Sequence, residues 1–173
     1  MKQSNEPDTL DQLSQAYDRI LELSKNALDE AKEESGPLVE KIVHQAKEKA
    51  LEVAEITREQ AENVAHYVMR DLHDAAKFVE KQQRELSDWL RVDEMQIENS
   101  VLDRFSDMVD RAKLELNHLA RTAAKMSEWH TGEITSIGTL KCKNCGQTLH
   151  FLRTGHIPPC AKCQGTVFER GHD

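Results

Sequence analysis

The sequence predicts a mainly α-helical protein, in which long antiparallel helices are followed by a small β ribbon at the C-terminus. From Leu10 to Ala123, apolar residues recur at intervals near 3.5 and only one glycine and one proline interrupt the chain. After Trp129 the chain gathers six glycines and several β-branched residues, which favours short strands and tight turns. We therefore divide the chain into a helical region, 1–128, and a ribbon, 129–173.

The first two helices are predicted from their apolar stripes. One is expected over residues 8–34 and the next over residues 37–56. The Ser-Gly-Pro triplet at 35–37 separates them, because glycine suits the residue after a helix and proline suits the first turn of the next helix.

Two further helices follow. Thr57 to Gln60 has the form of a capping box and indicates a new start, although an unbroken helix is the alternative because the apolar period continues. The third helix is expected to carry Leu86 and Trp89. Asp93 to Gln96 offers another capping-box-like start, and the last apolar stripe ends at Ala123. Many stripe positions are alanine, so we expect coiled-coil-like seams, and self-association through the helices stays open.

Charge is spread unevenly along the chain. The net charge is −8, but residues 131–173 hold five basic and three acidic residues, so this segment is about +2 and the helical part about −10. Phosphate backbones repel an acidic body, which argues against non-specific nucleic-acid binding by the helices. No apolar run approaches the roughly 20 residues that span a bilayer, and the polar N-terminus lacks a signal-peptide core. We expect a cytoplasmic protein with no membrane partner.

Four cysteines form the pattern C-x2-C, fourteen residues, C-x2-C. In a reducing compartment, two such close pairs predict metal ligands rather than disulfides. Zn²⁺ takes four thiolates tetrahedrally, so two tight loops can close around one structural ion. The sequence thus predicts a zinc ribbon with the ligands Cys142, Cys145, Cys160 and Cys163. Iron, as in rubredoxin-type electron carriers, is the rival metal. The gap between the loops is expected to hold a strand near Leu149 to Arg153.

A four-thiolate zinc site has no open position at which water can be activated, so its expected role is to fold a module without a large core. Loss of the metal is then expected to unfold the tail and leave the helices intact. His150, His156 and His172 are interpreted as surface or outer groups rather than ligands. No nucleophile motif, P-loop or dinucleotide fingerprint occurs, so we expect no enzyme activity.

The entry to the ribbon resembles a known family. The segment from Trp129 to Cys142, with His130, Gly132, Glu133, Gly138 and Leu140, is similar to the bacterial YbeL-like family of zinc-ribbon-containing proteins. Glu55-Ile-Thr-Arg58 and Arg70-Asp-Leu72 are similar as well, so the resemblance covers most of the chain. It implies helices followed by a zinc ribbon in a bacterial cytoplasmic protein. Ser136 stands where a glycine is common, and Ala161 where a proline is frequent.

Three functional hypotheses follow. In the first, the ribbon docks on a protein or nucleic-acid partner through exposed basic residues (Lys143, Arg153, Lys162 and Arg170), while the helices act as a spacer or a dimerisation arm. In the second, the protein is an RNA-polymerase accessory factor, because Asp71 to Ala76 contains a D-x-x-D-x-A string like the working tip of one such group. In the third, the cysteines serve an iron electron carrier or a thiol redox switch.

Overall fold

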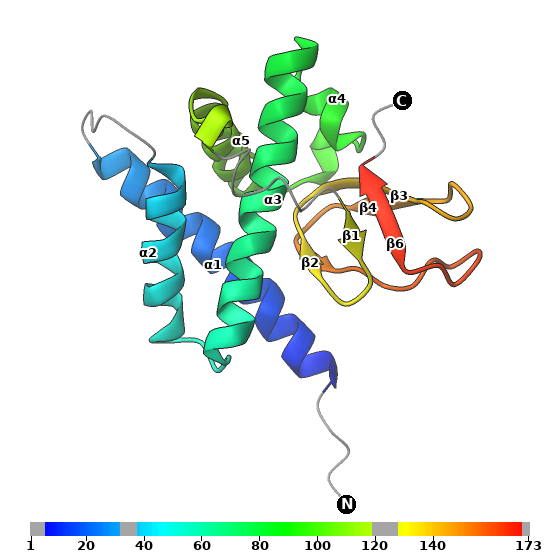
Figure 1. Cartoon of the computed structure of the whole chain (residues 1–173), viewed down its shortest axis with the longest axis horizontal. Coiled ribbons are helices and arrows are strands. Elements are labelled where there is room, and N and C mark those ends of the chain that lie inside the picture. The colour runs from blue at the N-terminus through cyan, green and yellow to red at the C-terminus, as the bar shows by residue number, and fades with distance from the viewer. Residues whose placement is uncertain (1–5, 32–37, 119–127, 171–173) are drawn as a thin grey trace, which may run out of the picture.

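The computed structural model describes residues 6–31, 38–118 and 128–170 (Figure 1). It confirms a mainly helical protein with a C-terminal antiparallel ribbon. The helices are α1 (Glu6–Glu30), α2 (Val39–Leu51), α3 (Arg58–Gln82), α4 (Leu86–Leu90), the 3₁₀ turn η1 (Glu94–Gln96) and α5 (Asn99–Leu114). The strands are β1 (Trp129–His130), β2 (Ile134–Thr135), β3 (Gly138–Cys142), β4 (Thr148–Phe151), β5 (Gly155–His156) and β6 (Val167–Arg170).

Helix α3 is the centre of the molecule. It packs against α1, α2 and α5 on one side, and against α4 and the ribbon on the other (Figure 1). The predicted capping box at its start is confirmed: the Thr57 side chain accepts from Gln60 N, and the Gln60 side chain accepts from Thr57 N. Because α2 already ends at Leu51, the alternative of one unbroken helix is wrong.

The later helix boundaries differ from the prediction. Leu86 and Trp89 do not extend α3, because Gln83 turns into the left-handed conformation with φ +52° and α4 starts separately. Asp93 caps the short turn η1 rather than α5. The break between α3 and α4 and the break between η1 and α5 contain no glycine, so apolar periodicity alone could not locate them. The predicted stop at 35–37 and the last stripe residue, Ala123, lie outside the described residues.

The ribbon is built from a four-stranded antiparallel sheet in the order β1-β6-β3-β4 and a small β2-β5 pair. The strand β4 begins one residue before the predicted strand at Leu149 and ends at Phe151, and it pairs with β3. Cys142 at the end of β3 faces Phe168 of β6, so the metal loops emerge from neighbouring strands.

Two hydrophobic cores meet at the ribbon. The larger core lies between the helices, and it also includes Ile134 and Ile137 from the ribbon. The smaller core lies inside the ribbon and consists of Trp129, Leu140, Ile157 and Phe168 with the cysteines. The ribbon therefore packs against the helical body rather than hanging from it as a free tail. Within the described part of the chain, no helix is both long and apolar enough to cross a bilayer.

Candidate metal centre

The two cysteine loops have the same backbone design. In each loop, the N–H of the first cysteine donates to the carbonyl five residues on, and the residue four positions on donates back to that cysteine's carbonyl. That fourth residue has positive φ in both loops: +77° at Gly146 and +62° at Gln164. Each loop thus presents two thiols from one tight turn. In the second loop the residue in this conformation is Gln164 rather than the glycine that follows it.

Gly165 is needed for a different reason. A Cβ at this position would lie 3.1 Å from both Cys142 Sγ and Cys163 Sγ and 3.3 Å from Asn144 Cβ. A side chain would therefore push into the sulfur cluster. The absence of a side chain at Gly165 lets the second loop close over the first.

The four sulfur atoms converge on one point. The ligand atoms of Cys142, Cys145, Cys160 and Cys163 all lie within 4.8 Å of one another. Cys142 and Cys163 are 3.6 Å apart at sulfur, as are Cys145 and Cys160. A disulfide needs about 2.05 Å, whereas a tetrahedral zinc ion with bonds of about 2.3 Å separates its sulfurs by about 3.8 Å. The donor set and its spacing therefore fit one structural zinc ion.

The cysteine thiols differ in their pKa values. The side chain of Asn144 and the backbone N–H of Gly165 lower the pKa of Cys163 to about 6. At Cys145 the backbone N–H of Gln147 also lowers the pKa, but burial and hydrogen bonds with the other thiols outweigh it and raise the pKa to about 12. Close thiols thus compete for one negative charge. A divalent cation at the centre removes this competition, because coordinated thiols are deprotonated.

The histidines near the cluster are not part of it. His150 hydrogen-bonds through Nδ1 with the Thr139 hydroxyl at 2.9 Å, and His156 lies exposed in β5. His172 lies outside the described residues. In the part of the chain that the structure describes, the four cysteines are the one group that brings three or more metal-binding atoms together.

Comparison with known proteins agrees with this geometry. The model of a family described as a zinc-ribbon containing domain matches residues 26–172. The chain belongs to this family. "Uncharacterized protein YbeL" of Escherichia coli K12 is 28% identical over 134 residues, which cover 76% of this chain and 81% of the relative. The protein of the same name from E. coli O157:H7 matches equally. No solved structure matches the chain.

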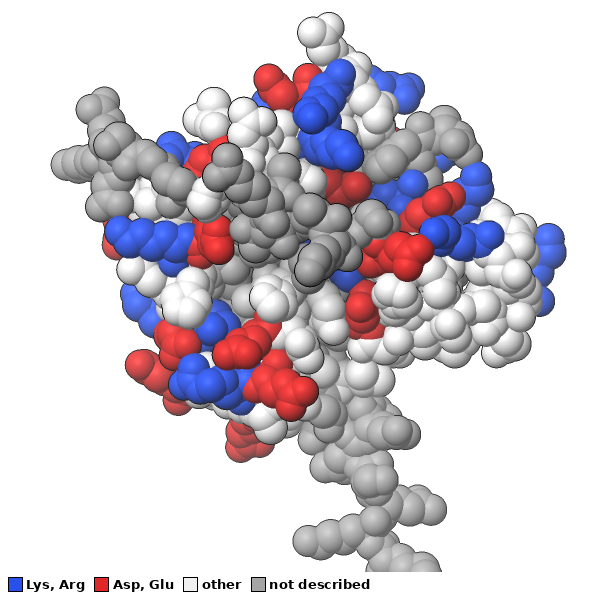
Figure 2. All heavy atoms as spheres, in the orientation of Figure 1, with Lys and Arg blue, Asp and Glu red and all other residues white. Residues whose placement is uncertain are grey.

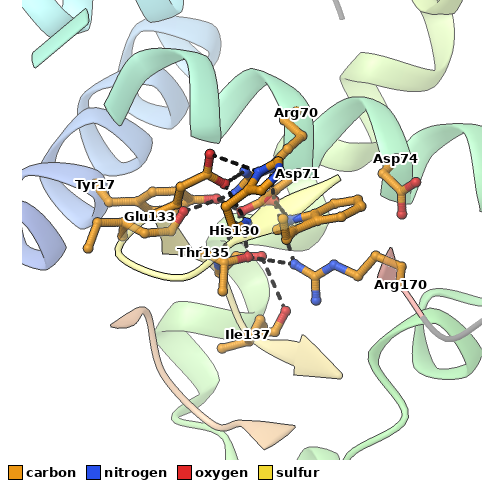
Figure 3. Close-up of polar contacts among 12 residues, drawn as sticks. Tyr17, Arg70, Asp71, Asp74, His130, Glu133, Thr135, Ile137 and Arg170 are labelled. Carbon is orange, nitrogen blue, oxygen red and sulfur yellow. Dashed lines mark hydrogen bonds and ion pairs between the residues drawn. The ribbon is translucent and has the colours of Figure 1, made fainter. Parts of the chain in front are cut away.

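This zinc-ribbon protein has a second polar cluster that sequence reasoning did not find. Its centre is Asp71 of α3, whose carboxylate is fully buried (Figure 3). Asp71 Oδ2 accepts from the Tyr17 hydroxyl at 2.7 Å and from Ser136 N at 2.9 Å. Its Oδ1 accepts from Trp129 Nε1 at 2.8 Å and from Arg70 Nε at 3.2 Å. One carboxylate thus ties α1 and α3 to the ribbon.

Arg70 completes the connection. Its Nη1 lies 2.6 Å from Glu133 Oε2, and its Nη2 donates to the Ile134 carbonyl at 3.0 Å (Figure 3). A signal for this cluster is present in the sequence, because Arg70-Asp-Leu72 and the Trp129-to-Glu133 segment are both family-like stretches. Their partnership could not be read from them, because 58 positions separate Asp71 from Trp129.

Arg170 was wrongly included in the predicted docking surface. It was expected to be exposed, yet it is only 4% exposed. Its guanidinium stacks over Trp89 at 4.3 Å and Trp129 at 5.2 Å, and lies 3.6 Å from Asp71 Oδ1. A nearby carboxylate and two aromatic faces stabilise this buried cation. Lys143, Arg153 and Lys162 do lie at the surface.

The structure also shows where the D-x-x-D-x-A string and the aromatic residues of the ribbon lie. The D-x-x-D-x-A string lies in the middle of α3, away from any hairpin tip, and its first aspartate is buried. The version of the polymerase hypothesis that uses this string as a working tip is therefore wrong. Phe168 and Trp129 are buried in the ribbon core, where they serve as packing residues.

Proposed function

We propose that this protein is a non-enzymatic interaction protein whose zinc-stabilised ribbon docks on a protein partner in the reducing cytoplasm. One observation carries the proposal: the four converging thiols leave a zinc ion no open position for substrate or water. A metal bound in this way organises a surface rather than a reaction. The two cysteine loops lie at the end of the ribbon that points away from the helices (Figure 1).

Charge favours a protein over a nucleic acid as the partner. Arg170 is withdrawn into the interior, and Lys143 Nζ is held by Glu128 Oε1 at 2.6 Å. The acidic helices are packed against the ribbon, so a phosphate backbone that approached the ribbon would also meet their field. Figure 2 shows mixed charges over the helices, whereas the ribbon at the right is mostly white, with Lys and Arg along its outer edge.

The ribbon also has an uncharged edge. Residues 147–152 contain no charged side chain, and Leu152 at their end is 40% exposed. This segment includes β4, which is an edge strand of the sheet. Uncharged edges of this kind are suited to contact with another protein. Binding to RNA polymerase, without the α3 string, is one special case of the proposal.

Site-specific photo-crosslinking in the native cell tests the proposal. A benzophenone amino acid is placed at Lys162 in the second cysteine loop, at Leu152 beside β4, and at Glu52 after α2 as a matched exposed control. We expect one protein to crosslink from positions 162 and 152 but not from 52. Crosslinking should also vanish when Cys145→Ser is added.

Two results would contradict the proposal. One is an equal crosslinking pattern from ribbon and control positions. The other is binding of duplex DNA or single-stranded RNA, measured by fluorescence anisotropy at low salt, that weakens with added salt and with Lys162→Glu. That second result would replace the protein partner with a nucleic acid.

A further inference from the structure

A groove on the helical body gathers three of the chain's histidines. It has a volume of about 630 Å³ and lies between α2, α3 and the turn that follows α5. Its floor is apolar and formed by Val43, Ala65 and Met69, which are buried. Its rim carries the imidazoles of His44, His66 and His118. None of these side chains belongs to the cysteine cluster.

The two helices present the same pair of residues to this groove. On α2, Glu40 precedes His44 by four positions, and on α3 Glu62 precedes His66 by four positions. Residues four apart lie on one face of a helix. Helices α2 and α3 run side by side (Figure 1), and all four residues line the groove. The groove is therefore flanked by one Glu–His pair on each wall.

The third imidazole is held in place by the fold. Glu115 accepts from the backbone N–H groups of Leu38 and Val39, at the first turn of α2. This contact fixes the turn after α5 against α2. His118, three residues on, reaches Glu40 with Nε2 at 2.8 Å from Oε2. The ring is thus already oriented by a carboxylate, as the imidazoles of protein metal sites commonly are.

We propose that this groove binds a second, exchangeable divalent transition metal ion through His44, His66 and His118. Neutral imidazole is the donor that Ni²⁺, Cu²⁺ and Zn²⁺ share in proteins. Glu40 orients His118, and Glu62 lies four residues before His66 on the same helix face. The nearby Lys47 ammonium is already paired, lying 3.4 Å from Glu48 and 4.0 Å from Glu62.

The site differs from the cysteine cluster in how it would form. The metal-binding atoms of this second set do not all lie within 4.8 Å of one another. Binding therefore requires the exposed His44 and His66 side chains to rotate inward over the groove. An ion held by exposed imidazoles keeps open coordination positions and exchanges readily, whereas the thiolate-bound zinc is structural.

Calorimetric titration of the untagged, zinc-loaded full chain with NiCl₂ tests the proposal. We expect one nickel ion per chain, with the zinc content unchanged before and after the titration. His44→Ala, His66→Ala and His118→Ala should each weaken nickel binding about tenfold or more, and Glu62→Gln should weaken it less. His156→Ala removes an exposed histidine from the ribbon and should leave the affinity unchanged.

Thermal melts of each variant show whether it is folded, so that lost binding can be assigned to lost ligands. The proposal is overturned if the folded wild-type chain binds no nickel. It is equally overturned if nickel binds as well to the His44→Ala/His66→Ala double variant, or if nickel enters only by displacing zinc.

Discussion

Trp129 donates its indole N–H to Asp71 Oδ1 at 2.8 Å, which joins the core of the zinc ribbon to the middle of α3. The Trp129 ring packs with Cys142, Cys160 and Phe168, while its nitrogen reaches the carboxylate at the centre of the helical body. One side chain therefore contacts both the metal module and the helices. Because coupling between two sites is reciprocal, zinc binding and docking of the ribbon should strengthen each other.

The first prediction concerns Asp71→Asn. The substitution removes the charge that Arg70 and Arg170 face in the interior, and it places an amide group among N–H donors. Breaking a buried ion pair in this way costs about 3–5 kcal/mol of unfolding free energy. We expect that loss in chemical denaturation, together with faster transfer of zinc to a chelator. Asp88→Asn, which breaks only an exposed pair with Arg84, should cost about 0–1 kcal/mol and leave zinc transfer unchanged.

The second prediction concerns pH and Asp18. Burial raises the pKa of this carboxyl, although its hydrogen bond from Thr154 acts in the opposite direction. A raised pKa in the folded state means that stability is present at low pH and is lost as pH rises through that pKa. Asp18→Asn keeps an acceptor for Thr154 without the charge. It should stabilise the protein at pH 7, by less than about 1 kcal/mol, and the gain should vanish below about pH 3.9.

The pKa of Asp71 is shifted in the opposite direction from that of Asp18, so its effect on stability has the opposite dependence on pH. Burial tends to raise the pKa of Asp71, but Arg70, Arg170 and the hydrogen bonds from Trp129 and Tyr17 outweigh it and lower the pKa. Its contribution is therefore present above about pH 3.9 and is lost as pH falls. If Asp18→Asn were destabilising at pH 7, burial would not be the dominant influence on that carboxyl.

The third prediction concerns Cys145→Ser. Structural zinc supplies roughly 10–16 kcal/mol of apparent binding energy in small modules, which matches or exceeds the 5–15 kcal/mol that stabilises a typical domain. The ribbon should therefore lose its order and its zinc. Because Ile134 and Ile137 pack in the helical core, we also expect the thermal midpoint of the helices to fall by several degrees.

Circular dichroism at 222 nm measures both effects: most of the helical signal should persist at 25 °C, but its melting midpoint should drop. Lys162→Ser, an exposed change in the other cysteine loop, serves as the control. It should change neither the helical signal at 25 °C nor the melting midpoint. An unaltered melting midpoint in Cys145→Ser would mean that the ribbon and helices are energetically independent.

The fourth prediction compares two glycines. Both Gly138 and Gly132 have positive φ, at +127° and +91°. A Cβ at Gly138 would lie 2.7 Å from Arg170 Nη1 and 3.4 Å from Trp89, whereas one at Gly132 meets nothing within 4 Å. Gly132→Ala should cost only backbone strain, about 1–3 kcal/mol. Gly138→Ala should cost more, because it also displaces the buried guanidinium, and equal losses in urea denaturation would refute that account.

Much of the fold follows from local sequence. Apolar periodicity indicated the helices, and the Thr57–Gln60 capping box located the start of α3. The cysteine spacing identified the residues that converge, because two residues between cysteines build a loop whose geometry depends on its own backbone. The break at Gln83 was missed, since an ordinary residue there adopts a conformation that usually signals glycine.

The sequence by itself determined that four thiols meet and that helices precede them, because both patterns depend on residues that lie close together in the chain. Only the tertiary structure decided that Asp71, Trp129 and Arg170 share one buried cluster, and that the ribbon is fastened to α3. The physical reason is distance along the chain. A charge on a helix normally faces water, and only packing against a segment far away in sequence turns it into an interior group with a partner.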